Sequence, residues 1–202
     1  MESISHRRPA LTVVITCVIE PMCYSGIVME IFTIGHSNHT WEAFVALLKL
    51  HGIQVLVDIR TNPVSKYAAF ANKKTLSALL AKDGVEYVYL GNSLGGMPAD
   101  RSCYDAKGRP DYRAIRSMAF FQQGLDELLS LARDSRVAIM CAEEDPSQCH
   151  RRLLVGPALE QREATLLHIR ADGSTQSSDT LAGRKAYQRQ LQGTLPLEQS
   201  DG

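Results

Sequence analysis

A stretch of twelve residues in the last third of the chain holds the side chains best suited to chemistry. Residues 141–152 read CAEEDPSQCHRR, so two thiols, an imidazole, several carboxylates and two guanidinium groups lie close together in sequence. The apolar run 137–140 directly before it is typical of a short buried strand. Asp145 as an N-cap, Pro146 at the first helical position and Gln148 in a capping-box pattern predict that a helix begins here. Because open α/β sheets bind ligands beyond the carboxyl ends of their strands, we expect the functional site in this stretch.

Three chemistries are open to the two cysteines of this stretch. Cys149 lies at the predicted helix start beside His150 and two arginines, surroundings that suit a nucleophilic thiol. Alternatively, Cys141, Cys149 and His150 could bind a metal, although the seven residues between the thiols are unlike the spacing of a zinc-finger knuckle. The thiols could also form a reversible redox pair. Cys141 taken alone is slightly more typical of a small buried core residue than of a functional thiol, but the segment as a whole is not typical of a structural turn.

Polar residues also follow two earlier predicted strands. After the first of these strands, His36 is a candidate acid or base. After the second, residues 55–59, strand alternation places Asp58 and Arg60 on the same side. The guanidinium of Arg60 suits a clamp on phosphate or carboxylate, and an ion pair with Asp58 or an interaction with a helix end is the equal alternative.

The predicted helix start also suggests an anion site. Free N–H groups and the positive end of the helix dipole would face a ligand there, and Arg151 and Arg152 add positive charge. Because carboxylates lie beside them, we expect a ligand that also offers hydroxyl, amine or base donors. The candidate catalytic residues are Cys141, Cys149, His36 and His150. The candidate substrate-binding residues are Ser37, Asp58, Arg60, Ser65, Gly95, Gly96, Glu143 and Arg151.

Strands and helices alternate along the part of the chain that must position these residues. The predicted strands are residues 31–34, 55–59, 85–90, 137–140 and 165–169. The predicted helices are residues 41–50, 74–82, 111–133 and 145–162. This alternation predicts an α/β fold, namely a flavodoxin-like three-layer sandwich with a mostly parallel sheet of about five strands.

We expect one α/β domain over residues 29–170. Residues 1–28 contain Arg7-Arg8 and an apolar run, but they offer no small-x-small cleavage site, so we interpret them as an extension rather than a signal peptide. Met29 stands directly before the first strong strand and could be a natural start. Residues 171–202 form a polar C-terminal tail in which residues 181–191 could form a short helix.

Composition narrows the possible partners. Of the 202 residues, 45% are hydrophobic, and Lys+Arg equals Asp+Glu at 22 each, which argues against long electrostatic contacts with a nucleic-acid duplex. No apolar run approaches the ~20 residues of a membrane span, so no membrane partner is expected. The five cysteines are spread over the chain, which favours a reducing compartment such as the cytoplasm. A small anionic ligand or a nucleotide is the expected partner, nucleic acid is possible, and the sequence specifies neither a cofactor nor an oligomeric state.

Four motifs in this order resemble one protein family, the domain of unknown function 488. They are TIGHS (33–37), DIRTNPVS (58–65), LGNSLGG (90–96) and CAEEDPSQCHR (141–151). The resemblance covers about residues 29–169 and implies an α/β domain whose marked residues lie in these same loops. The family's name leaves the activity open. From the site residues themselves, we expect an enzyme acting on a nucleotide, a nucleic-acid component or another small anionic substrate through a Cys/His/Arg site. A non-catalytic nucleotide- or nucleic-acid-binding module is the alternative.

Overall fold

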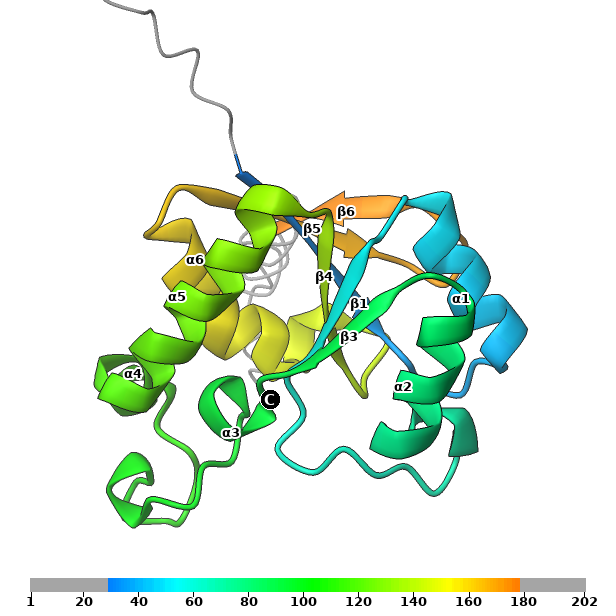
Figure 1. The fold of residues 1–202 in the computed structure, drawn as a ribbon. Helices are drawn as coiled ribbons and strands as arrows, with labels where there is room; N and C mark the ends of the chain where they lie inside the picture. Colours follow the sequence, from blue (N-terminus) through cyan, green and yellow to red (C-terminus); the bar gives the residue numbers. More distant parts are fainter. Residues whose placement is uncertain (1–28, 179–202) are drawn as a thin grey trace, which may run out of the picture.

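The apolar runs of the sequence become neighbouring strands of one six-stranded sheet in the computed structural model, which describes residues 29–178 (Figure 1). The strands are β1 (Met29–Gly35), β2 (Val55–Asp58), β3 (Glu86–Tyr89), β4 (Val137–Cys141), β5 (Ala164–Ile169) and β6 (Thr175–Ser177). Their order is β3-β2-β4-β1-β5-β6, in which the first five pair in parallel and β6 pairs antiparallel with β5. Every residue of β4 is buried, as expected for a central strand of a parallel sheet.

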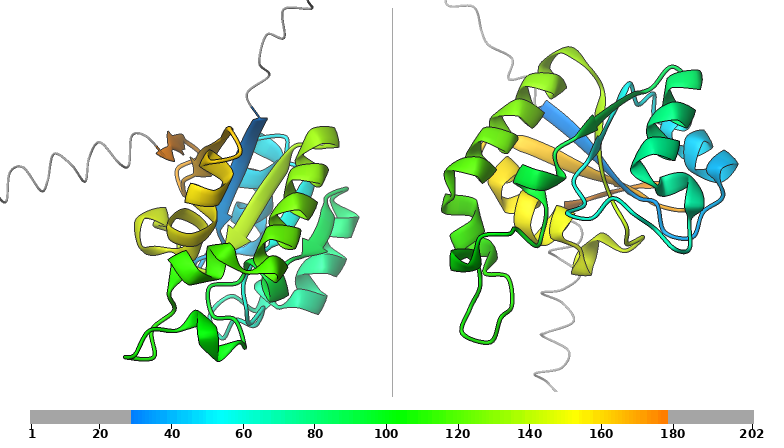
Figure 2. Two further views of the ribbon diagram at one scale, coloured as in Figure 1. Left: turned by 90° about the vertical axis from the view of Figure 1, so that its left-hand side faces the viewer. Right: turned by 60° about the horizontal axis from the view of Figure 1, so that its bottom comes forward.

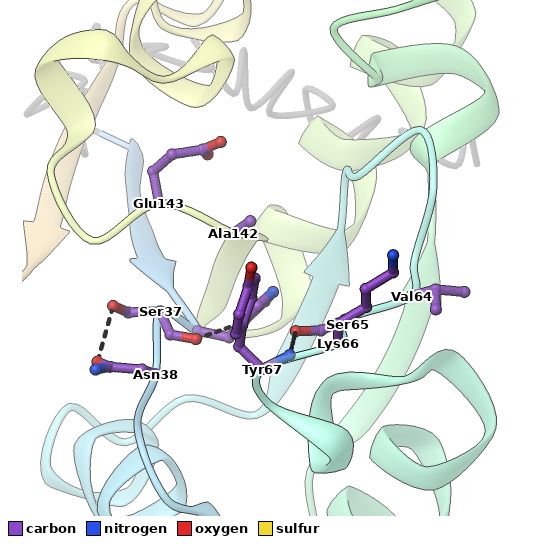
Figure 3. A pocket seen from close by; sticks show the side chains of 9 residues that line it. Ser37, Asn38, Val64, Ser65, Lys66, Tyr67, Ala142 and Glu143 are labelled. Carbon is purple, nitrogen blue, oxygen red and sulfur yellow. Dashed lines mark hydrogen bonds between the residues drawn. The ribbon is translucent and has the colours of Figure 1, made fainter.

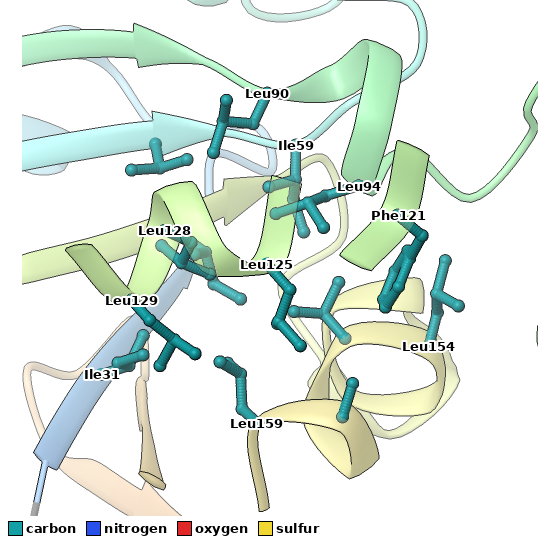
Figure 4. Close-up of a cluster of buried hydrophobic side chains, with 14 of the residues drawn as sticks. Ile31, Ile59, Leu90, Leu94, Phe121, Leu125, Leu128, Leu129, Leu154 and Leu159 are labelled. Carbon is teal, nitrogen blue, oxygen red and sulfur yellow. The ribbon is translucent and has the colours of Figure 1, made fainter. Parts of the chain in front are cut away.

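Helices cover both faces of this sheet (Figures 1 and 2). One face carries α1 (Trp41–Leu50), η1 (Ala69–Ala71) and α2 (Lys73–Lys82). The other carries α3 (Gly91–Leu94), η2 (Arg101–Cys103), α4 (Tyr112–Ser117), α5 (Ala119–Asp134) and α6 (Gly156–Glu160). Alternate strand residues point to opposite faces, so Leu56 packs in one core with Phe44 of α1, whereas Val57 packs in the other with Leu125 of α5. Figure 4 shows this second core, where side chains of the sheet meet those of α5 and α6.

The predicted α/β three-layer architecture with a mostly parallel sheet is confirmed. All five predicted strands are present. The sixth strand, β6, lies in the segment that was predicted to be a polar tail. This strand is only three residues long and none of its side chains is buried, so it carries no apolar pattern by which sequence could reveal it. The strand order also differs from the 2-1-3-4-5 order of flavodoxin, so the likeness lies in the layers and not in the connections.

Two predicted helices are interrupted in the structure. The long helix over residues 111–133 divides into α4 and α5 at Met118, whose backbone is extended (φ −74°, ψ 140°). The helix expected over 145–162 divides into a 3-10 turn η3 (Pro146–Gln148), a π-helix η4 (Arg151–Val155) and α6. Cys149 separates the first two pieces because its backbone is also extended (φ −99°, ψ 146°).

The predictions for residues 1–28 and for a helix at 181–191 lie outside the described residues. Within residues 29–178, no helix has the length and apolar character that crossing a bilayer requires.

The buried His168 of β5 links the neighbouring strand β1 to the residue that follows β6. His168 of β5 lies between Thr33 of β1, whose hydroxyl oxygen is 2.7 Å from its Nδ1, and Ser178, whose hydroxyl oxygen is 3.2 Å from its Nε2. Burial, and then the positive charges of Arg151, Arg152 and Arg170, lower the pKa of His168 from 6.5 to about 3. The ring is therefore neutral at pH 7, and its two nitrogens link β1 to the residue that follows β6.

This histidine is expected to make the fold sensitive to mild acid. Because its pKa is lower in the folded protein, its contribution to stability is complete above pH 6.5 and is lost progressively as the pH falls toward about 3. Between pH 7 and pH 5, the free energy of unfolding should drop by about 2 kcal/mol from this residue alone. Urea unfolding at both pH values would measure the drop, and His168→Gln should show a smaller one. An equal drop in the variant would contradict the assignment.

Candidate functional site

Four parallel strands end side by side at one edge of the sheet. Gly35 at the end of β1 is in register with Cys141 of β4, and Asp58 at the end of β2 is in register with Met140 and Tyr89 of its two neighbours. The backbone continues the contact beyond the strands, because the N–H groups of residues 36 and 37 donate to the carbonyls of residues 141 and 142. The loops that follow β1, β2, β3 and β4 therefore meet at this edge, where the sequence predicts a site.

The two thiols of residues 141–152 lie in direct contact. The Sγ atoms of Cys141 and Cys149 are 2.6 Å apart, and the side chains are 0% and 1% exposed. The hydrogen bond with Cys141, together with burial, raises the pKa of the Cys149 thiol. Cys149 therefore holds its proton at neutral pH unless another group accepts it.

Arg151 is fully buried beneath this pair. Its Nη1 donates to the carbonyl oxygen of Glu143 at 2.7 Å and lies 3.2 Å from the Cys141 sulfur, and its Nη2 donates to the carbonyl oxygen of Glu144 at 2.5 Å. Its Nε has no hydrogen-bond partner among residues 29–178. Arg151 thus holds the loop after β4 against the Cys141 thiol. The sequence instead predicts that Arg151 binds a ligand.

His150 is oriented by a backbone carbonyl. Its Nε2 lies 2.9 Å from the carbonyl oxygen of Ile59, so that nitrogen carries the ring proton in the neutral form and donates it there. Nδ1 is then an acceptor, and it lies 3.8 Å from the Cys149 sulfur. Burial lowers the pKa of His150 below its ordinary 6.5. The imidazole is therefore neutral near pH 7 and can accept a proton from Cys149.

Glu143 completes the cluster around the thiols. One of its carboxylate oxygens accepts a hydrogen bond from the Cys141 thiol at 3.2 Å. Burial acts to raise the pKa of Glu143, but hydrogen bonds from the thiols of Cys149 and Cys141 outweigh it, so the pKa is lowered. A negative carboxylate and the positive Arg151 therefore flank the Cys141 sulfur from two directions.

The two thiols and Glu143 are the described residues that could hold a metal ion. Their ligand atoms all lie within 4.8 Å of one another, whereas His150, the third ligand suggested by the sequence, is not among them. Tetrahedral zinc with Zn–S bonds of ~2.3 Å places two sulfurs roughly 3.8 Å apart. The thiols would therefore have to separate from their present 2.6 Å to bind zinc together.

Asp58 and Arg60 form a buried ion pair beside this cluster. Arg60 donates from Nε and Nη2 to both carboxylate oxygens, at 2.9 and 2.6 Å, and Asp58 also accepts from the hydroxyl of Tyr87 at 2.8 Å. The side chain of Arg60 is 5% exposed, and that of Asp58 is 0% exposed. The Nη1 of Arg60 is buried and has no hydrogen-bond partner among residues 29–178, so it is an unsatisfied buried donor. The ion-pair alternative for Arg60 is therefore the one that the structure shows, and a ligand could reach Nη1 only if the cavity wall moved.

A large cavity of about 970 Å³ opens beside these residues. Cys149, His150, Glu143 and Arg60 lie in its wall, whereas Cys141, Arg151 and Asp58 are buried behind it. The chain between β3 and the start of α4 forms another part of its wall, with Gly96, Arg101, Tyr104 and Tyr112. Gly96 of this wall is one of the predicted binding residues, whereas Arg101, Tyr104 and Tyr112 are not among the residues predicted from the sequence. The sequence of residues 95–112 has no helix or strand periodicity from which the position of these wall residues could be predicted.

A second cavity of about 510 Å³ adjoins the first and shares Val64, Ala142 and Glu143 with it. Figure 3 shows the residues from three loops that surround it, including Ser37, Ser65 and Tyr67. His36 also lines this cavity, and burial lowers its pKa. The predicted site residues are therefore divided between two adjoining cavities rather than placed in one.

Several predicted binding residues have local structural partners. The Ser65 hydroxyl accepts from the N–H groups of Tyr67 and Ala68 and fixes a turn. A Cβ on Gly95 would lie 2.3 Å from the carbonyl oxygen of Gly91, and one on Gly96 would lie 3.0 Å from the His150 Cβ. The glycine pair thus allows the loop after β3 to pack closely against the site, in addition to any contact with a ligand.

The predicted anion site at a helix start near Asp145 does not form as expected. Asp145 does cap a turn, since its carboxylate accepts from the N–H of Ser147 at 2.8 Å. That turn, η3, is three residues long, so it has no substantial dipole, and its capping carboxylate already occupies the N–H group. The sequence correctly indicates a cap at Asp145. It does not indicate that the helical conformation ends at Cys149.

Comparison with protein families matches residues 40–156 to the family described as Domain of unknown function DUF488. This range covers more than half of the chain and includes Arg60, Cys141, Cys149 and His150, whereas His36 and Ser37 precede it. No curated protein and no solved structure matches the chain.

Proposed function

Because the chain belongs to the family of domains of unknown function DUF488, whose description leaves the activity open, we propose a function from the site itself. The protein is an enzyme that takes a small anionic substrate, such as a nucleotide or a nucleic-acid component, into the larger cavity. It attacks this substrate with the sulfur of Cys149. His150 accepts the thiol proton.

The observation that carries this proposal is the placement of Cys149. It lies in the wall of the larger cavity, with Nδ1 of a neutral His150 3.8 Å from its sulfur. The raised pKa of the thiol means that it is not a preformed thiolate, so it needs a base. A hydrogen bond to a carbonyl fixes His150 in the tautomer that leaves Nδ1 free to accept, which is the arrangement of a nucleophile and its oriented base.

The chemistry of the cavity wall supports an anionic substrate with an aromatic part. The volume of about 970 Å³ is at the upper end for small-molecule sites. Arg101 is exposed and forms no ion pair with another described residue, and the buried Nη1 of Arg60 beside the cavity has no partner among these residues. Tyr104 and Tyr112 line the cavity as aromatic residues that can contact a base, and the guanidinium of Arg101 lies over the Tyr104 ring, 5.7 Å from its centroid. The adjoining cavity gives room for a second part of the substrate beyond Glu143.

A binding module without catalysis is the second candidate, and one observation favours it. Both thiols are almost completely buried, and the pKa of Cys149 is raised, as expected for structural cysteines. In that case the same arginines and tyrosines would hold a nucleotide, and Cys149 would serve only to shape the cavity.

A ligand screen with a matched pair of variants tests the substrate class. Nucleoside monophosphates and sugar phosphates would be tested by thermal shift, because a bound ligand stabilises the folded protein. Arg101→Gln should weaken binding of a phosphate-bearing hit by about 10-fold, the effect of losing one charge-assisted hydrogen bond. Arg133→Gln is the control, since Arg133 is exposed near the end of α5, outside both cavities.

The same hits decide between the two candidates. A substrate should protect Cys149 from iodoacetamide, because it would occupy the wall in which the thiol lies. Stabilisation by a ligand that leaves Cys149 labelling unchanged would favour the binding module. Equal loss of binding in Arg101→Gln and Arg133→Gln would refute the placement of the anion.

A further inference from the structure

We propose that Cys141 and Cys149 form a reversible disulfide when the protein meets a peroxide. The bond would consume the thiol that we assign as the nucleophile, so oxidation would switch the enzyme off. Only this consequence rests on the proposed function. The formation of the bond depends on the positions of the two cysteines alone.

The thiols are already close to bonding distance. Their sulfurs are 2.6 Å apart, and a disulfide bond is about 2.05 Å long, so a shift of roughly half an ångström joins them. Cys141 ends a central strand and contacts the guanidinium of Arg151. Cys149 lies in extended backbone between η3 and η4, so its sulfur can move without disturbing a regular helix.

The two cysteines differ in access, which assigns them different roles. Cys149 lies in the wall of the larger cavity, whereas Cys141 is 0% exposed and lines neither cavity at this edge. A peroxide that enters the cavity therefore meets Cys149 first. Cys141 lies directly behind it as the thiol that resolves the oxidised product. Cys103, the remaining cysteine of the described residues, belongs to the core between η2 and α5.

The reaction balances with hydrogen peroxide as the oxidant. The Cys149 sulfur gives up its proton to Nδ1 of His150 and attacks one peroxide oxygen. The O–O bond breaks, and the leaving hydroxide takes the proton from His150, so Cys149 becomes a sulfenic acid and one water forms. The Cys141 sulfur then attacks the Cys149 sulfur, its proton leaves with the hydroxyl group as a second water, and the S–S bond forms. The two thiols lose two electrons in total, and the peroxide is reduced to water.

Tryptic digestion gives a direct test. Cleavage after Arg136 and Arg151 releases residues 137–151 as one peptide that contains both cysteines and no internal Lys or Arg. Full-length protein would be treated with hydrogen peroxide, alkylated with iodoacetamide under denaturing conditions, digested without reductant and analysed by mass spectrometry. We expect most of this peptide to be unalkylated and lighter by two hydrogens. Dithiothreitol before alkylation should restore two alkylated cysteines.

Three variants make the result specific. Cys103→Ser should leave the bridge unchanged. Cys141→Ser should prevent it and let Cys149 proceed to sulfinic acid, because the resolving thiol is gone. Cys149→Ser should leave Cys141 reduced, because peroxide cannot reach it. The proposal is overturned if peroxide converts wild-type Cys149 to sulfinic acid without a bridge, leaves both thiols unchanged, or links either one to another cysteine. Because the readout is a mass, these outcomes do not depend on whether Cys149 is a nucleophile toward a substrate.

Discussion

Arg151→Ala is expected to lower the free energy of unfolding by about 3–4 kcal/mol. The fully buried guanidinium donates to the carbonyls of Glu143 and Glu144 and contacts the sulfur of Cys141. Hydrogen bonds from a charged donor contribute about 1.5–3 kcal/mol each, and the variant leaves both carbonyls without their donor. Removing a buried charge recovers part of its desolvation cost, which keeps the expected loss below the sum of the separate contacts.

Urea unfolding measures this loss, and the neighbouring arginine is the control. Arg152 is 19% exposed, and its closest carboxylate contact, with Glu160, is 3.9 Å long. Arg152→Ala should therefore cost no more than about 1 kcal/mol. Similar losses in the two variants would show that the buried contacts of Arg151 do not hold the loop after β4 in place.

Arg60→Ala is expected to be almost as damaging, at about 3 kcal/mol. The fully buried carboxylate of Asp58 would lose its bidentate partner and keep only the hydroxyl of Tyr87 and the N–H of residue 60. An uncompensated buried charge is among the most destabilising changes a single substitution makes. An arginine that only clamped a ligand would leave stability unchanged, so the thermal midpoint of this variant separates the two roles.

A double variant tests whether the loss comes from the stranded carboxylate. Asp58→Asn removes the charge that Arg60 balances, so adding it to Arg60→Ala should recover part of the stability. The combined loss should be smaller than the sum of the single losses by about 1–3 kcal/mol, as expected for residues in contact. Losses that simply add would contradict the ion-pair account. A ligand that binds the double variant as well as wild type would show that Nη1 of Arg60 makes no contact with it.

The fold was predictable where apolar runs carry the information. The run 137–140 is continuous, and the run 55–59 is interrupted only by Asp58, because strands of a parallel sheet are buried on both faces. The strand order could not be predicted in the same way, since the alternation of elements does not specify which strands are neighbours. The break at Cys149 was also hidden, because the capping signal at Asp145 is genuine but local.

The site was predictable in its location but less so in the roles of its residues. Cys149, His150 and Arg60 do reach the wall of a cavity at the carboxyl edge. Arg151 follows His150 directly in sequence, yet the two side chains have different surroundings because η4 begins between them and directs Arg151 into the core. Arg151 is buried because the backbone conformation of the loop after β4 brings two carbonyl groups to its guanidinium. The spacing of residues in the sequence does not predict that conformation.

The pH dependence of Cys149 alkylation tests the central claim most directly. Because burial lowers the pKa of His150 below 6.5, its base form is already complete at neutral pH. We expect iodoacetamide labelling of wild-type Cys149 to rise as the pH increases through the pKa of His150 and to stay high through pH 7. In His150→Gln, labelling should be on the order of 100-fold slower at pH 7, the size of a general-base contribution. It should rise only in the alkaline range, where the thiol ionises unaided.

Two internal standards belong to the same measurement. Burial raises the pKa of Cys103, and no histidine of residues 29–178 is among the groups that shift it, so its labelling should be the same in both proteins. His51→Gln, at the end of α1 and away from both cavities, should behave like wild type. Identical pH profiles for Cys149 in wild type and His150→Gln would contradict the account, because the thiol would then have no base and the cavity no nucleophile.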